Sequence, residues 1–170
     1  MAGGRYLDRV NGVTTQERAI QTSAGAGDAD KLVRLDSAGK FDASFMPDGF
    51  GAETIVLPTD ESLIAGDFVN IFDDAGTATA RKADNSNGRR AHGVVIAAVT
   101  APANATIYYG QIVTDDYTTL TPGGTCWLGT NGRATQTAPS GSGVVSQELG
   151  FASAATDIAV QIAEPVILSA

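Results

Sequence analysis

Residue types that carry out catalysis are scarce in this chain. Its 170 residues include one histidine, one cysteine and one tryptophan, and aromatic residues make up 6% of the sequence. His92 is the only imidazole that could act as a base, and a serine or cysteine nucleophile would depend on it. Cys126 has no second cysteine for a disulfide and no basic neighbour in sequence, so we expect an inert buried thiol. Because a lone histidine is more often structural, we expect no enzyme, no cofactor and no bound metal.

Positive charge and long apolar runs are also scarce. The chain has 11 lysine and arginine residues against 19 aspartate and glutamate residues, a formal net charge of -8. This charge repels phosphate backbones, so we do not expect nucleic acid to be a partner. No early stretch joins a basic segment to an apolar core, and no window holds eighteen consecutive apolar residues. We therefore expect neither a signal peptide nor a membrane span, and a protein that is made in a cytoplasm.

The first 52 residues have too little apolar material for a hydrophobic core. Their short apolar clusters are separated by glycine-, alanine- and aspartate-rich segments such as SAGAGDAD, and the region closes with PDG. Such a segment cannot bury enough apolar surface to fold alone. The stretch from Thr14 to Glu17 has the spacing of a helix capping box, but glycines follow within about two turns. We expect an extended N-terminal arm with little regular structure and at most a short helix.

Residues 53–170 have the pattern of short β-strands. The runs are rich in valine, isoleucine, threonine and aromatic residues and are bounded by turn signals such as DDAG, TPGG and TNG. Eight or nine such runs at regular spacing predict an all-β body, either a small β-barrel or a sandwich. DFVNIFDDAGTATARKA and TCWLGTNGRATQTAP both have an apolar strand, a glycine turn and an Ala-Thr strand, and a strand with an early glycine follows each. This echo indicates two similar halves.

Three groups of charged residues could form a site. Counting from Asp28 or from Asp36 does not give the glycine that a helix-loop-helix calcium site needs at its sixth position, so Asp36 to Gly39 is better explained as a turn. The pairs Asp73-Asp74 and Asp115-Asp116 could serve as the two carboxylates of a glycoside hydrolase, but both adjoin turn signals or strand ends. The loop ARKADNSNGRRAH could dock an acidic partner or could be solvated, and its basic residues are Arg81, Lys82, Arg89 and Arg90.

The chain resembles a known group of virion proteins. KLVRLDSAGKFDASFMP, preceded by SAGAGDAD, resembles a segment of the form "gadAgKlvaLDasGkfDaSfmP" near the start of tailed-bacteriophage structural proteins. The remainder is similar to the β-rich body of phage capsid decoration (cement) and head-fibre proteins. In those proteins the phrase G-T-x-x-x-L-G-x-x-G-x-x-T-x-x-x-P, followed by V-x-Q-x-x-G-x-A, precedes a final strand. The resemblance covers most of the chain and consists of turns and strand periodicity rather than reactive residues.

The resemblance implies a homotrimer on the outside of an icosahedral head, where it contacts the major capsid protein and clamps the capsomers. The arm, residues 1–52, would bind the capsid through spaced apolar anchors, and residues 53–170 would form the body. The expected capsid-binding residues are Tyr6, Leu7, Leu32, Leu35, Phe41, Phe45 and Met46. A tail-fibre or baseplate adaptor would use the same body, and a glycan-active enzyme is the alternative from another class.

Overall fold

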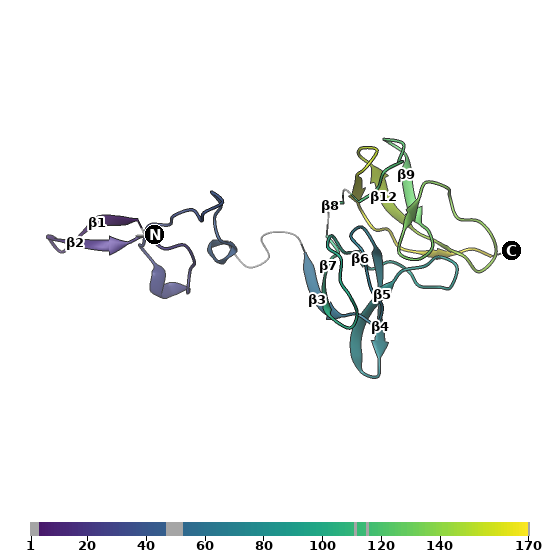
Figure 1. The fold of residues 1–170 in the computed structure, drawn as a ribbon, viewed down its shortest axis with the longest axis horizontal. Helices are drawn as coiled ribbons and strands as arrows, with labels where there is room; N and C mark the ends of the chain where they lie inside the picture. The colour runs from purple at the N-terminus through teal and green to yellow at the C-terminus, as the bar shows by residue number, and fades with distance from the viewer. Residues whose placement is uncertain (1–3, 47–52, 111, 115, 170) are drawn as a thin grey trace. The chain divides into compact units, whose positions relative to one another are not determined.

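The computed structural model describes residues 4–46, 53–110, 112–114 and 116–169. The chain divides into two compact units, Met1–Phe50 and Gly51–Ala170 (Figure 1). The boundary expected at residue 52 and the PDG turn before it lie outside the described residues. We call the two parts the N-terminal unit and the body.

The N-terminal unit contains a β-hairpin that the sequence pattern did not lead us to expect. Strands β1 (Arg5–Val10) and β2 (Val13–Arg18) pair antiparallel. The turn between them is Asn11-Gly12, and both residues have positive φ, 52° and 82°, as a two-residue hairpin turn requires. The capping-box spacing at Thr14 to Glu17, from which we expected at most a short helix, does not begin one, because this segment lies within β2. The rest of the unit is loop with two 3₁₀ turns, η1 (Ala26–Asp28) and η2 (Ala43–Phe45).

The body is all-β, as predicted, and its strands form two five-stranded antiparallel sheets and one smaller pair. The first sheet has the order β3-β7-β6-β4-β5, and the second has the order β10-β9-β12-β13-β8. The strands of the first sheet are β3 (Thr54–Pro58), β4 (Phe68–Asp74), β5 (Thr77–Lys82), β6 (Gly93–Val94) and β7 (Asn104–Tyr108). Those of the second are β8 (Ile112–Thr114), β9 (Thr125–Leu128), β10 (Ala134–Thr135), β12 (Glu148–Ala152) and β13 (Ile158–Val160). The pair is β11 (Val145–Ser146) with β14 (Val166–Ile167).

No sheet in the described part of the body closes into a barrel. The edge strands β3 and β5 of the first sheet approach each other, but they meet only in a single parallel bridge between Thr59 and Ala80. A barrel would need a continuous ladder at this place. Of the two architectures that the sequence left open, the closed barrel is therefore corrected to curved open sheets, which Figure 1 shows in the blue-to-teal and green-to-yellow parts of the body.

The two halves of the body share one topology. If the five strands of each half are numbered along the chain, leaving out β11, both sheets have the order 1-5-4-2-3. The early glycine of each half also has the same role. A Cβ on Gly93 in β6 would lie 2.7 Å from the carbonyl oxygen of Tyr108 in β7, and a Cβ on Gly150 in β12 would overlap the carbonyl oxygen of Ala159 in β13. The expectation of two similar halves is thus confirmed at the level of strand order.

Two hydrophobic clusters form the core of the body. One lies within the curve of the first sheet and includes Leu63, Val69 and Ile107. The other joins the two halves, with Phe68 from the first and Leu149 from the second among its members. Every member of both clusters lies between residues 57 and 162, so the body has a core that needs nothing from the N-terminal unit. In the described ranges, no helix has the length and apolar character needed to cross a membrane.

Candidate partner-binding surface

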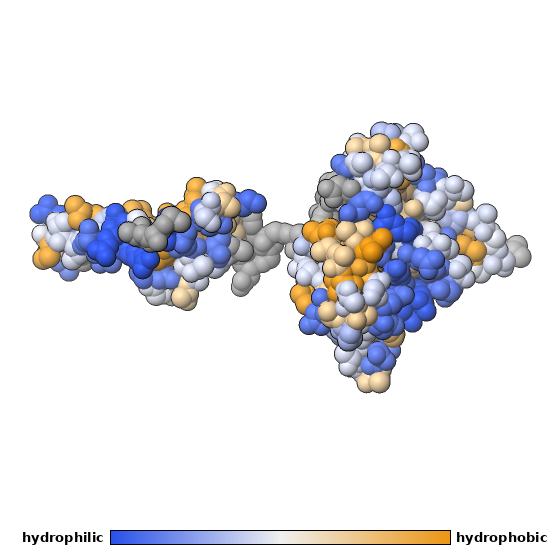
Figure 2. Space-filling view, in the orientation of Figure 1, coloured by the Kyte–Doolittle hydropathy of each residue, from blue (hydrophilic) through white to orange (hydrophobic). Residues whose placement is uncertain are grey.

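The apolar side chains of the N-terminal unit remain in contact with solvent. Leu7 is 73% exposed and Phe41 is 58% exposed. In the described part of this unit no residue is buried, so the unit has no core of its own. Figure 2 shows orange apolar areas between blue polar ones on the surface of this unit. Among the seven expected anchors, five are exposed, namely Leu7, Leu32, Leu35, Phe41 and Met46, whereas Tyr6 and Phe45 are partly buried.

Local hydrogen bonds fix the backbone between two of the expected apolar anchors, Leu35 and Phe41. Asp36 Oδ1 accepts hydrogen bonds from the backbone N–H groups of Ala38 and Lys40, at 2.8 and 2.9 Å. Gly39, with φ of 75°, completes this turn, so the prediction of a turn here is confirmed. The turn separates Leu35 from Phe41 along the chain, and both side chains stay exposed.

Two further contacts tie the loop of the N-terminal unit to itself and to the hairpin. The backbone N–H of Leu32 donates to the Tyr6 hydroxyl at 3.4 Å, and the N–H of Ser23 donates to Ser44 Oγ at 2.8 Å. Polar contacts of this kind are weak in water, each contributing about 1 kcal/mol. The unit is therefore held together mainly by exposed hydrogen bonds.

Two further exposed apolar residues of the N-terminal unit were not among the anchors predicted from the sequence. Val13 is 62% exposed at the start of β2, and Val33 is exposed where a parallel bridge joins it to Ile20. The Asn11-Gly12 dipeptide was the signal that could have placed Val13 on a hairpin, because Asn-Gly is the strongest short-range mark of a two-residue hairpin turn. Val33 had no comparable signal.

Three of the four basic residues of the predicted docking loop have hydrogen-bond or ion-pair partners within the body, and the fourth, Arg90, lies beside His92. Arg81 stacks on the Phe72 ring at 4.0 Å from its centroid, and its Nε donates to Asn70. The other contacts are Lys82 Nζ to Asp67 at 3.7 Å, Arg89 Nη1 to Glu61 at 3.6 Å, and Arg90 Nε to His92 Nε2 at 3.0 Å. Docking an acidic partner on this loop would have to replace or share these contacts.

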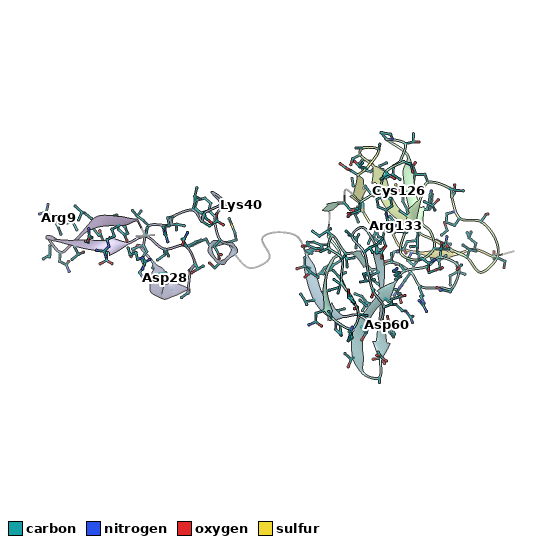
Figure 3. The ribbon with its side chains drawn as sticks, in the orientation of Figure 1. Arg9, Asp28, Lys40, Asp60, Cys126 and Arg133 are labelled. Carbon is teal, nitrogen blue, oxygen red and sulfur yellow. The ribbon has the colours of Figure 1, made fainter. Side chains whose placement is uncertain are left out.

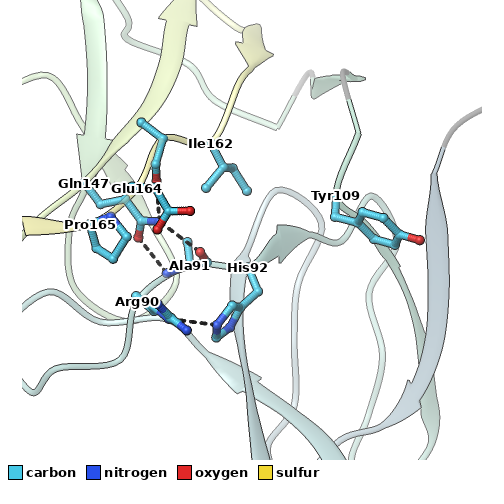
Figure 4. Close-up of a pocket in the computed structure, with 9 residues that line it drawn as sticks. Arg90, Ala91, His92, Tyr109, Gln147, Ile162, Glu164 and Pro165 are labelled. Atoms are coloured by element: carbon cyan, nitrogen blue, oxygen red, sulfur yellow. Dashed lines mark hydrogen bonds between the residues drawn. The ribbon is translucent and has the colours of Figure 1, made fainter.

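A pocket of about 300 Å³ lies beside His92 in the body (Figure 4). Its wall is positioned by the buried amide of Gln147. Gln147 Oε1 accepts from the N–H of Ala91 at 2.8 Å, and its Nε2 donates to the carbonyl oxygens of Ala91 and Ala163 at 3.0 and 2.9 Å. Gln147 thereby joins two segments far apart in sequence and leaves no amide group free for a ligand.

His92 is held as a neutral structural imidazole. Its Nδ1 faces the N–H of Ile71 at 2.9 Å, and its Nε2 faces Nε of Arg90. Since a neutral imidazole accepts at one nitrogen only, the backbone bond fixes Nδ1 as the acceptor and the contact with Arg90 is then not a hydrogen bond. Burial, and then the positive charge of Arg90, hold the pKa of His92 below its usual value. No described carboxylate bonds to this ring, and its accepting nitrogen is already bonded to the backbone.

The acid pairs and the cysteine also have structural positions. Asp73 and Asp74 are exposed at the end of β4, and Asp73 Oδ1 accepts from the N–H of Gly76 in the following turn at 2.9 Å. Asp115 lies outside the described residues, and Asp116 accepts from the Thr114 hydroxyl. Cys126 is buried as expected, and burial raises the pKa of its thiol. In the described ranges no group of three or more His, Cys, Asp or Glu side chains could hold a metal ion.

Comparison with models of protein families, with curated proteins and with solved structures finds no match for this chain. Its function has to be inferred from the geometry of the chain itself and from the resemblance of its sequence segments.

Proposed function

We propose that this chain is a structural protein of a tailed-bacteriophage virion, a capsid decoration (cement) protein that stabilises the shell. It binds the outer surface of the head as a homotrimer, and its partner is the major capsid protein. The N-terminal unit contacts the shell, and the body stands outside it. The protein is made in the host cytoplasm and joins the virion there.

One observation carries this proposal, namely that the described N-terminal unit displays large apolar side chains but buries none. A two-stranded hairpin without a hydrophobic face to pack on is only marginally stable in water. Full burial of a side chain such as Leu7 or Phe41 against a partner would contribute about 1.5 to 3 kcal/mol. A segment with this composition gains its order when it binds, and it covers a wide surface for its length.

The charge distribution also supports a division of labour between the two units. Residues 1–50 contain seven acidic and six basic residues, whereas residues 51–170 contain twelve acidic and five basic residues. The body thus carries nearly all of the net charge of -8. This net charge favours solubility of the body, while the nearly neutral N-terminal unit can approach a surface of either sign.

Co-sedimentation of the purified chain with heads that lack it tests this proposal. We expect the protein to sediment with the heads and, after labelling, to appear on the head surface in electron micrographs. Label on the tail would favour the adaptor function instead. Hydrolysis of a capsular polysaccharide that is abolished by Asp73→Asn would establish the glycan-active enzyme in its place.

A further inference from the structure

Three arginines share one face of the β1–β2 hairpin. Residues that lie directly opposite each other in an antiparallel pair point to the same side, and successive residues alternate. In the register of the hairpin, Arg5 is opposite Arg18, Leu7 is opposite Gln16, and Arg9 is opposite Thr14. Arg5, Leu7, Arg9 and Arg18 therefore form one surface, which we call the basic face, with Leu7 at its centre.

The arginines of the basic face lack acidic partners. In the described ranges none of the three forms an ion pair, and the side chain of Arg5 donates only to the amide oxygen of Gln16, at 2.9 Å. Like charges directly opposite each other destabilise a strand pair, so Arg5 and Arg18 weaken a hairpin that has no core to compensate. Such an arrangement becomes favourable when an anionic surface lies over it.

A cation-rich hollow continues the basic face. This hollow has a volume of about 390 Å³, and its charged lining residues are Arg18, Lys31, Arg34 and a single acid, Glu17. Lys31 already pairs with Asp28 at 2.7 Å. Arg34 Nη2 donates to Gln21 at 2.6 Å, but the buried Nε of Arg34 has no hydrogen-bond partner in the described structure. Arg18 belongs to both the basic face and the hollow, so the two form one continuous surface.

We infer that this continuous basic surface binds an acidic segment on the surface of a partner protein. Aspartate or glutamate carboxylates pair with Arg5, Arg9 and Arg18, one carboxylate enters the hollow beside Arg34, and Leu7 makes the central apolar contact. The inference rests on the proposed function, under which the partner is the shell protein. A protein is favoured over nucleic acid because the basic face has the apolar side chain of Leu7 at its centre and has no aromatic ring on which a base could stack.

The test compares variants that change the net charge equally at different places. Arg9→Glu and Arg18→Glu reverse charges of the basic face, and Lys40→Glu is the matched control. Figure 3 shows Arg9 on the hairpin and Lys40 at the opposite end of the same unit. Arg18→Glu also places an opposite charge across from Arg5, so it strengthens the hairpin and any loss of binding cannot come from unfolding.

The full-length variants are sedimented with heads that lack the protein, in about 0.1 M and about 1 M salt, where charges are screened beyond about 10 Å and about 3 Å. We expect each arginine reversal to weaken binding at least about fivefold at the lower salt, Lys40→Glu to change it less than about twofold, and the difference to shrink at the higher salt. Equal weakening by all three variants would overturn the inference. A changed solution mass of Arg18→Glu would also overturn it, because a second copy would then be the occupant.

Fluorescently labelled poly-glutamate and an oligonucleotide of equal length separate this inference from the proposed function. If the wild-type chain does not sediment with heads, the proposed function fails. The basic surface would still be supported if the wild-type chain and the Lys40→Glu variant bind poly-glutamate and the Arg18→Glu variant does not. If the wild-type chain binds neither heads nor poly-glutamate, the basic surface is refuted. Tighter binding of the oligonucleotide than of poly-glutamate would refute a protein partner.

Discussion

At the scale of single residues, Gly150 is the position where the backbone leaves least room. Its φ of 132° is one that other residues rarely adopt, and a Cβ there would overlap the carbonyl oxygen of Ala159 in the neighbouring strand. We expect Gly150→Ala to lower the free energy of unfolding by about 2 to 4 kcal/mol, measured by urea denaturation. Gly143→Ala is the control, because Gly143 also has a positive φ, 80°, but a Cβ on it would meet nothing within 4 Å. Equal losses in both variants would mean that φ alone, and not the overlap, limits position 150.

His92 gives a prediction about pH. Its pKa is held below the ordinary value of 6.5, so the unfolded chain takes up a proton at a higher pH than the folded chain does. The folded protein should therefore lose stability as the pH falls from 6.5 toward the lower pKa of the folded state, and not above 6.5. His92→Asn keeps a neutral acceptor for the N–H of Ile71 but does not titrate. Urea unfolding at neutral and at mildly acidic pH should show a smaller loss in this variant, and identical losses would contradict the prediction.

Individual side chains could be predicted where local chemistry decides their role. The turn at Asp36 and the burial of Cys126 follow from near neighbours in sequence. The role of Asp67 could not be predicted. Asp67 is fully buried, and its carboxylate lies near Lys82 and near Arg133, which is 66 positions away and stacks on Tyr117. Such a cluster forms only when both halves of the body have folded.

At the scale of elements, the strands of the body were predictable and the hairpin was not. Each run of β-branched and aromatic residues after residue 53 contains a strand. In β2, the segment Thr14 to Glu17 fits both a capping box and a strand, and the Asn11-Gly12 turn decides between them because it pairs the segment with β1. β14 was missed because Val166 and Ile167 form a strand only through their pairing with β11.

The apolar anchors give a prediction at this scale. Phe45→Ala combined with Met46→Ala should weaken sedimentation with heads strongly and leave the thermal transition of the free protein nearly unchanged, because no described residue of the N-terminal unit is buried. Ile64→Ala combined with Ile96→Ala is the matched control, since both side chains are exposed on the body. If the control weakens binding as much, the body and not the N-terminal unit holds the shell. Circular dichroism of each free variant verifies that the fold is intact.

At the scale of the whole molecule, the sequence indicated two similar halves but not how far each sheet closes. Closure depends on whether edge strands distant in sequence form a full ladder, and in the first sheet they form one bridge, between Thr59 and Ala80. Short-range patterns carry no information about this contact. The shared order of the two sheets, by contrast, follows from repeated turns and glycines that are visible along the chain.

Oligomerisation is the first prediction for the whole molecule. The body keeps several large apolar side chains exposed, and it has no disulfide to supplement its packing. Association that buries these side chains, Ile55, Val56, Phe151, Val166 and Ile167 among them, would add to stability, and closed symmetry is the usual outcome. We expect light scattering at micromolar concentration to give the mass of a trimer. A monomer mass would refute the homotrimer.

The division of labour between the two units is tested by removing one of them. A chain that begins at Glu53 keeps every member of both hydrophobic clusters, so it should fold and give the β-rich circular dichroism of the body. It lacks the exposed apolar residues and the basic surface of the N-terminal unit, so it should not sediment with heads. A competition experiment gives a second readout. An excess of the truncated chain should fail to displace the full-length protein from the heads. If the truncated chain sediments undiminished, the body and not the N-terminal unit holds the shell. The basic segment from Arg81 to Arg90 would then be the candidate contact. Its ion pairs with Glu61 and Asp67 would have to be exchanged for contacts with the shell.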